Sequence, residues 1–269
     1  MSQSSPLFDS ARIKRFHARA KKQVGGDHDF LRRRALEEML SRLQGINRDF
    51  SKGLLVSPFA VNPAGLPGFL HQGAEFAQAA PQSLDLVISL MHLHVANDLP
   101  GQLRAARRAL RPDGLFLGAL LGDRTLHELR HALLEAESAI TGGATARIIP
   151  FADLRALGGL LQGAGFALPV VDADRVTVRY GDILALMHDL RGMGESNPLS
   201  GPLRSLRRGV LARAQSLYRA RHGDDEGRLA ASFDIVHLIG WAPHESQPQP
   251  LEPGSAQVSL KQVLGRKPR

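Results

Sequence analysis

The amino-acid sequence predicts an α/β protein built on a parallel sheet, and the stretch 83–121 carries that prediction. Leu84 to Leu90 is an apolar, partly β-branched run of strand length, typical of a strand buried on both faces. Residues 99–111 then place apolar side chains at helical spacing, and Leu115 to Leu121 is a second apolar strand. A strand, a helix and a strand in this order form a parallel pair with a right-handed crossover.

The expected site follows from this unit, because ligands of an open α/β sheet bind beyond the carboxyl ends of the parallel strands. The segments that follow the two strands are Ser89 to Asp98 and Leu121 to Thr125. Asn97 and Asp98 are also suited to cap the crossover helix, so these two side chains have a structural explanation beside the functional one.

Apolar spacing and glycine or proline breaks divide the rest of the chain into parts. The expected parts are an N-terminal helical cover at 1–48, a core at 49–180, a helical lid insert at 181–228, a last core strand within 229–246, and a mobile tail at 247–269. The further helices are expected over 7–23, 29–43, 125–141, 150–161, 182–193 and 203–221, and the further strands over 168–180 and 232–241.

Composition limits the classes of function. The chain has no cysteine, which excludes disulfides and thiolate chemistry, and no apolar run of membrane-spanning length. The net charge of +8 is compatible with nucleic acid, an anionic surface or an acidic partner, but solvated helix faces are the simpler explanation. Few aromatic residues accompany the charges, so nucleic acid is not expected. We expect a cytoplasmic protein with a protein partner or substrate, and peripheral contact with an anionic surface stays open.

Residues 83–130, SLDLVISLMHLHVANDLPGQLRAARRALRPDGLFLGALLGDRTLHELR, resemble one segment of a known family. They are similar to the fourth-to-fifth-strand segment of class I S-adenosylmethionine-dependent methyltransferases. Within that family they resemble the subgroup of the complex I assembly methyltransferase-like factor and the biotin-synthesis carrier-protein methyltransferase. The likeness continues through 150–153, 159–169 and 241–247. It implies a Rossmann-like sandwich, and a protein or carrier-linked substrate; the segment 240–250 favours complex I assembly.

The family's first strand ends in a glycine turn, and that pattern is degenerate here. Leu55 stands where the family has Asp, Ser57 and Val61 stand where it has glycines, and Pro58 removes a backbone donor. The interval up to Asp85 is short for two helical crossovers, so the family's second strand has no evident counterpart. Glu75, the only carboxylate of the interval, is interpreted as a loop residue.

Two functional hypotheses remain open. In one, a shortened site still holds S-adenosylmethionine; in the other, the chain is a non-catalytic scaffold, a pseudoenzyme that has lost the cofactor. The resemblance implies as cofactor contacts Ser57, Phe59, Ser89, His94, Asn97 and Asp98. Because the turn is degenerate, we expect weak binding or none. An open turn would favour the enzyme, and a pocket filled by Phe59, Val61 or Pro58 would favour the scaffold.

The sequence identifies no catalytic residue firmly, and the candidates are His94, His244 and Glu245. His94 lies at a strand end where the family also has a histidine, although Val95 replaces the family's following tryptophan. His244 and Glu245 follow the last strand on the expected site side and could supply a base, or could simply form a turn.

His127 to His131 forms an H-E-x-x-H pattern on an expected helix, which in zinc proteases holds a metal. No third ligand can be placed from the sequence. Solvent-facing histidines are the preferred interpretation, and no metal is expected.

Overall fold

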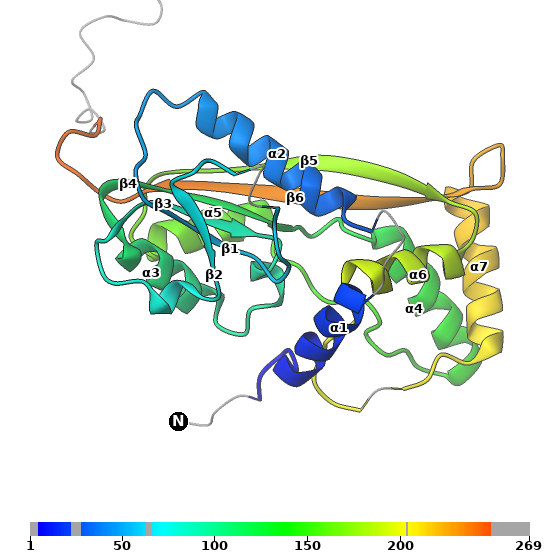
Figure 1. Ribbon diagram of the computed structural model, residues 1–269. Helices are drawn as coiled ribbons and strands as arrows, with labels where there is room; N and C mark the ends of the chain where they lie inside the picture. The colour runs from blue at the N-terminus through cyan, green and yellow to red at the C-terminus, as the bar shows by residue number, and fades with distance from the viewer. Residues whose placement is uncertain (1–4, 23–27, 63–65, 203, 249–269) are drawn as a thin grey trace, which may run out of the picture.

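The computed structural model describes residues 5–22, 28–62, 66–202 and 204–248, and within them the chain forms an α/β sandwich around one mixed sheet (Figure 1). The strand order is β2-β1-β3-β4-β6-β5, with β6 antiparallel to both neighbours and the first four strands parallel. The strands are β1 (Gly53–Val56), β2 (Leu70–Gly73), β3 (Leu84–Leu90), β4 (Leu110–Leu121), β5 (Ala167–Tyr180) and β6 (Leu229–Trp241). This architecture confirms the predicted fold class.

Helices cover both faces of the sheet and its carboxyl end. The helices are α1 (Ser10–Lys22), α2 (Phe30–Gln44), α3 (Leu99–Ala109), α4 (His127–Thr141), α5 (Leu154–Gly163), α6 (Ile183–Met193) and α7 (Arg208–His222), with short 3₁₀ turns η2 (Phe76–Gln78) and η3 (Leu93–Val95). Helices α3 and α5 share one buried cluster with the sheet, and α2 shares another with the opposite face and with the lid helices.

The unit β3–α3–β4 forms as the apolar pattern predicts. Leu86 to Leu90 pair in parallel with Leu115 to Ala119. The carboxylate of Asp98 accepts a hydrogen bond from the N–H of Gly101 (2.8 Å), so Asp98 is the cap of α3. Strand β4 begins before the expected start at Leu115, because Leu110 already pairs with Leu84 ahead of a register shift.

The expectation that the second strand is missing was wrong. β2 pairs in parallel with β1, from Gly53 opposite Leu70 to Val56 opposite Gly73. The described part of the connection at 57–69 contains no helix. A Cβ atom on Gly53 would lie only 2.8 Å from the Leu70 side chain, and glycine therefore allows the two strands to pack closely.

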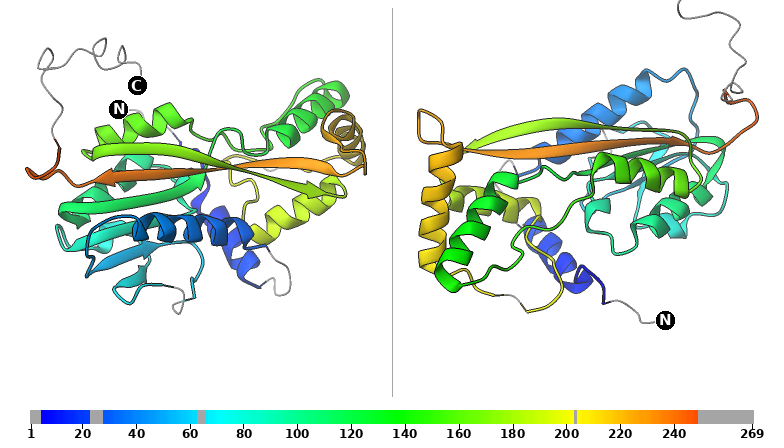
Figure 2. Two further views of the ribbon diagram at one scale, coloured as in Figure 1. Left: turned by 90° about the horizontal axis from the view of Figure 1, so that it is seen from above. Right: turned by 180° about the vertical axis from the view of Figure 1, so that it is seen from behind.

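A two-stranded ribbon carries the lid. Ile235 to Trp241 of β6 pair with both β4 and β5, whereas Leu229 to Asp234 pair with β5 alone. This ribbon projects past the parallel strands and reaches α4, α6 and α7 (Figure 2). Phe233 on the ribbon is buried in one cluster with Leu186 of α6 and Val210 of α7.

Some boundaries differ from the expected ones. Helix α7 begins at Arg208, five residues later than expected, and residue 203 lies outside the described residues. The expected mobile tail lies outside them beyond residue 248, and the division into five parts stays a prediction.

The H-E-x-x-H segment has a structural role. Glu128 is 3% exposed and accepts hydrogen bonds from the Ser232 hydroxyl (2.5 Å) and the Ser232 N–H (3.2 Å), which fastens α4 to β6. His131 is exposed, and the ring centroid of His222 lies 6.2 Å from that of His127. Within the described part of the chain, no group of three side chains is arranged to hold a metal ion.

We expect Glu128→Ala to lower the free energy of unfolding by about 1–3 kcal/mol, because two buried donors of Ser232 lose their acceptor. Chemical denaturation monitored by circular dichroism measures the change. Glu135→Ala, which removes a half-exposed ion pair with Arg221 on the same helix, is the matched control and should cost less than about 1 kcal/mol. Equal effects of the two substitutions would contradict the fastening role.

Candidate functional site

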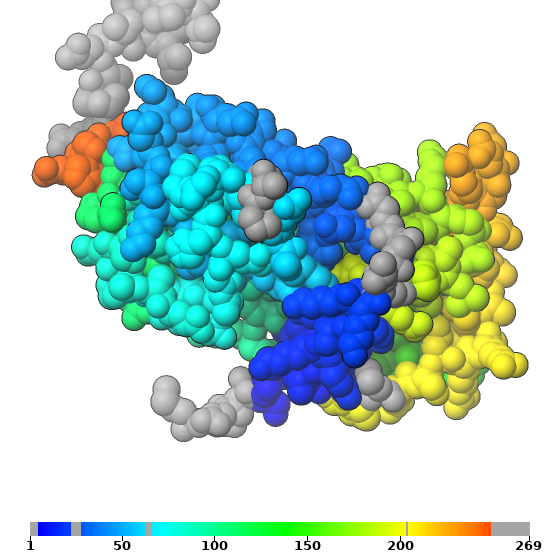
Figure 3. All heavy atoms as spheres, viewed as in Figure 1, coloured from blue at the N-terminus to red at the C-terminus, as the bar shows by residue number. Residues whose placement is uncertain are grey.

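A cavity of about 520 Å³ lies where β1, β2 and β3 end, and helix α1 covers it. Figure 3 shows α1 lying between the strand region and the lid on this face of the molecule. The cavity volume is within the usual range for sites that bind small molecules and cofactors. The lining comes from Ser57 and Pro58 after β1, Glu75 after β2, His92 and 95–98 after β3, and one face of α1. This is the edge of the sheet at which the sequence predicts the site.

The turn after β1 leaves the cavity open. The Phe59 ring is turned away from the cavity: it packs under the Arg32 guanidinium at 3.7 Å, 5.2 Å from the His17 ring. The carbonyl of Phe59 accepts from the Gln72 side chain (2.7 Å), which in turn accepts from the Val61 N–H (3.0 Å). Pro58 lines the cavity but does not fill it. Of the predicted cofactor contacts on this turn, only Ser57 faces the cavity.

Glu75 is the acidic residue that the sequence reasoning passed over. It lies two residues after the end of β2, its side chain is exposed, and it lines the cavity. In dinucleotide-binding folds, a carboxylate about 20 residues beyond the glycine turn accepts hydrogen bonds from ribose hydroxyls. The spacing from Ser57 to Glu75 matches this rule and could have identified Glu75 from the sequence.

Asn97 fixes the N-terminal segment to the core. Its side chain accepts from the N–H of Phe8 (2.8 Å) and donates to the carbonyl of Phe8 (2.9 Å). Phe8 in turn forms a β-bridge with Leu199 of the lid, and Arg12 donates to the carbonyl of Gly201 (3.0 Å). The N-terminal segment thus joins the core to the lid, and both hydrogen-bonding ends of Asn97 are already occupied.

His94 is buried and joins the core to the lid a second time. Its Nε2 lies 3.0 Å from a carboxylate oxygen of Glu195, in the loop after α6, while its buried Nδ1 has no partner among the described residues. Burial opposes the ionisation of Glu195, but His94, His17 and Arg32 outweigh it and hold the pKa of this carboxyl below its ordinary value. The sequence contains no signal for this pair, because the two residues lie 101 positions apart.

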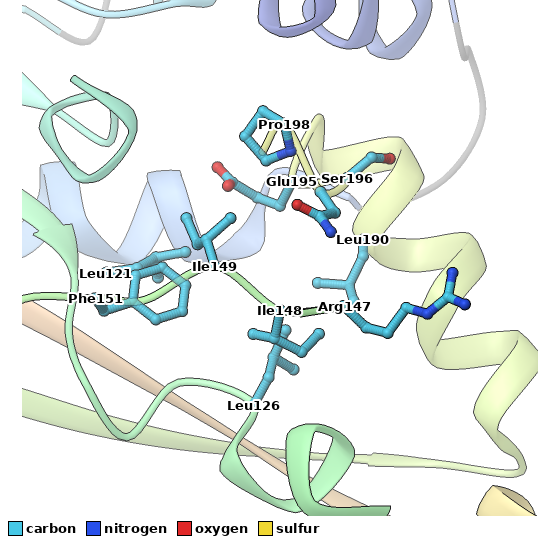
Figure 4. Close-up of a pocket in the computed structure, with 11 residues that line it drawn as sticks. Leu121, Leu126, Arg147, Ile148, Ile149, Phe151, Leu190, Glu195, Ser196 and Pro198 are labelled. Carbon is cyan, nitrogen blue, oxygen red and sulfur yellow. The ribbon is translucent and has the colours of Figure 1, made fainter. Parts of the chain in front are cut away.

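A second, smaller hollow lies beside this pair, between the segment 147–151 and the loop after α6 (Figure 4). It has a volume of about 30 Å³, enough for one water molecule, and adjoins a hollow of about 200 Å³ that also borders Glu195. Leu126, Ile149 and Phe151 form apolar walls, and the Arg147 guanidinium points away from Glu195. Glu195 of the pair therefore borders both of these hollows under the lid.

Ser89 and His92, both in the segment predicted after β3, differ in whether they line the cavity. Ser89 is fully buried with its hydroxyl 3.2 Å from Nδ1 of His92, so it supports the cavity wall and does not line the cavity. His92 borders the cavity, and burial, with smaller contributions from His94 and His17, lowers the pKa of its imidazole to about 3.

The expectation that His244 and Glu245 lie on the site side was wrong. β6 runs antiparallel to β4, so its last residue, Trp241, pairs with Leu115 at the amino end of β4. His244 and Glu245 follow it at the edge of the sheet opposite to the cavity, where both are exposed. Neither can act on a ligand in the cavity.

Comparison with known proteins agrees with this fold. Residues 34–118 match the family model described as a methyltransferase domain. The mitochondrial arginine-hydroxylase NDUFAF5 of Danio rerio is 43% identical over 186 residues, which cover 69% of this chain and 58% of that protein. The Homo sapiens protein of the same name is 41% identical, over 70% of this chain and 55% of its own length. The chain thus spans little more than half the length of these relatives.

A relative of different activity matches nearly end to end. The malonyl acyl-carrier-protein O-methyltransferase of Methylovorus is 29% identical over 90% of this chain and 92% of its own length. Among solved structures, the YcgJ protein of Bacillus subtilis superposes with a TM-score of 0.49 at 11% identity, covering 79% of this chain and 99% of that one.

These similarities support the class I S-adenosylmethionine-dependent methyltransferase family that the resemblance predicted. Within the family, its relatives include the NDUFAF5 arginine hydroxylases and the malonyl acyl-carrier-protein O-methyltransferases, the subgroup that the resemblance predicted. The expected cytoplasmic location is contradicted, because the NDUFAF5 relatives are mitochondrial. Among the described residues, no helix is both long and apolar enough to cross a bilayer.

We expect His92 to make the protein sensitive to acid. Because its pKa is about 3 in the folded chain and ordinarily 6.5, the unfolded chain binds the proton first as the pH falls. The stabilisation is complete above pH 6.5 and is lost as the pH falls towards 3. Between pH 7.5 and pH 5 the loss from this residue is about 2 kcal/mol.

Denaturation of the wild type and His92→Asn at the two pH values measures this loss. Asparagine keeps a hydrogen-bonding partner for Ser89 but does not titrate, so the variant should lose less stability than the wild type. His131→Asn removes an exposed histidine and should behave as the wild type. Identical pH dependence in His92→Asn and the wild type would show that His92 is not the cause.

Proposed function

We propose that this methyltransferase-family protein acts in the assembly of respiratory complex I, on a protein substrate. The observation that carries the proposal is the 43% identity to NDUFAF5, an arginine hydroxylase, over 186 residues. The likeness of residues 240–250 to the assembly factor supports the same process. A carrier-linked acid is the second substrate class, supported by the relative of the malonyl acyl-carrier-protein type at 29% identity.

The cavity fits S-adenosylmethionine only in part. Its volume is sufficient, and Glu75 supplies a carboxylate where the ribose hydroxyls of a nucleoside would lie. The turn after β1 does not fit, because Pro58 lacks an N–H donor and Ser57 carries a side chain where the family has glycine. Asn97 lines the cavity, but one N–H and one lone pair of its side chain are already used in holding the backbone of Phe8. We therefore propose that the cofactor binds weakly.

Each hydrogen bond lost at a buried site costs about 1–3 kcal/mol, so two such losses move a micromolar site towards the millimolar range. Titration calorimetry with S-adenosylmethionine and S-adenosylhomocysteine is expected to give dissociation constants above about 100 µM. Glu75→Gln should weaken the binding about tenfold further, because an amide accepts less strongly from ribose hydroxyls. Glu245→Gln, at the opposite edge of the sheet, should change nothing.

A dissociation constant near 1 µM for the wild type would show that the altered turn still binds tightly. Equal affinities of wild type and Glu75→Gln, measured where binding is detectable, would remove Glu75 from the site.

The second candidate function is a non-catalytic assembly scaffold. The observation that favours it is that Asn97, His94 and Phe59, three of the predicted cofactor contacts, are occupied in holding the N-terminal segment, the lid and α2. An experiment in cells that depend on this protein for complex I distinguishes the scaffold from the cofactor-dependent enzyme. A scaffold predicts normal complex I content with Glu75→Gln, and a cofactor-dependent enzyme predicts a loss of assembled complex with normal amounts of the variant protein.

A further inference from the structure

A hollow of about 340 Å³ lies on the lid, between the beginning of α6 and the outer face of α7. Ile183 and Leu184 of α6 and Leu211 of α7 give it an apolar floor. Leu184 is 58% exposed, the highest value among the large apolar side chains of the described residues. In Figure 1 the start of α6 faces α7, and no residue of this hollow lines the cavity under α1. We call this hollow the lid groove.

One buried polar group in the lid groove, the side-chain amide nitrogen of Gln215, lacks a hydrogen-bond acceptor among the described residues. The Gln215 carbonyl oxygen accepts from the N–H of Ile183 (2.7 Å) and so joins α7 to α6. Its amide nitrogen is buried and has no acceptor within the described part of the chain. A buried donor without an acceptor is unfavourable, and a ligand that brings a carbonyl or carboxylate oxygen relieves it.

Positive charge flanks the apolar floor at both ends. Arg208 and Arg219 lie on the same face of α7, about 16 Å apart along the helix axis. Neither has an ion-pair partner among the described residues, whereas Arg221 of the same helix pairs with Glu135. Asp182, the one carboxylate in the groove wall, is occupied in accepting from the N–H of Ala185 (2.7 Å).

We propose that the lid groove binds an acidic amphipathic helix of a partner protein. An apolar side chain of that helix packs on Leu184 and Leu211, and acidic residues on either side pair with Arg208 and Arg219, as in other helix-in-groove complexes. The concave shape fits a protruding side chain better than it fits the flat surface of a bilayer. Charge complementarity favours an acidic partner, because a partner without acidic residues would leave Arg208 and Arg219 unpaired in the complex.

This surface is independent of the proposed function, since none of its residues borders the cavity or the His94–Glu195 pair. Its test therefore does not depend on cofactor binding.

Fluorescence anisotropy with the full chain tests the lid groove. The probe is a labelled synthetic helical peptide with leucines on one face and glutamates beside them. The wild type should bind it, and Arg208→Glu together with Arg219→Glu should weaken binding at least about tenfold. Leu184→Ser, at an exposed position that tolerates the change, should weaken it about fivefold through lost apolar contact.

The matched control reverses two other exposed arginines, Arg104 and Arg155 on α3 and α5, to glutamate, which gives the same net charge at another surface. It should bind the peptide within about twofold of the wild type, because it reduces only the nonspecific charge attraction and leaves the groove arginines in place. Circular dichroism verifies that all variants are folded.

Four outcomes would overturn the proposal. Equal losses in the control and the groove variant would indicate nonspecific attraction, and equal binding of a peptide with glutamine for glutamate would remove the charge pairing. Binding of phosphatidylglycerol vesicles that depends on Arg208 and Arg219, without peptide binding, would make the surface a membrane contact. A dimer that Leu184→Ser abolishes in sedimentation would make it a contact between copies.

Discussion

The pairing of β5 with β6 is the interaction on which the rest of the structure depends. Along its far half, from Leu229 to Asp234, β6 pairs as a strand with β5 alone, and the segment after β4 adds hydrogen bonds to Ser232 and Asp234. The apolar residues of the ribbon bury the inner faces of α6 and α7, and Glu128 fastens α4 to the same strand through Ser232. Because the ribbon fixes the lid beyond the carboxyl ends of the parallel strands, the loop after α6 can reach His94.

Several side chains at that edge serve structure where family resemblance implied ligand binding. Asn97 holds the backbone of Phe8, His94 meets Glu195, and Asp98 caps α3. These contacts hold the cover beside the core and the lid, and the cavity wall still includes the polar side chains of Ser57 and Glu75.

The sequence predicted the central fold because β3 and β4 are long apolar runs joined by a helix with clear spacing. β2 was missed because its four residues include exposed His71 and Gln72 and have no apolar signature, and because a loop without a helix in its described part makes the crossover. The position of His244 was mistaken because the order of elements does not specify which way the last strand runs. Glu195 could not be found, since only the folded lid brings it to His94.

The contacts of the N-terminal segment also determine at what stage of synthesis this segment can dock on the lid loop. Phe8 bridges to Leu199, and Arg12 donates to the carbonyl of Gly201, 189 positions further along the chain. During synthesis, the residues made first must remain undocked until the lid loop has left the ribosome. Closure of the core against the lid is therefore a late event in folding, and such distant contacts slow it. Nascent chains that stop before residue 199 lack the Leu199 and Gly201 carbonyls that accept hydrogen bonds from Arg12 in the finished protein.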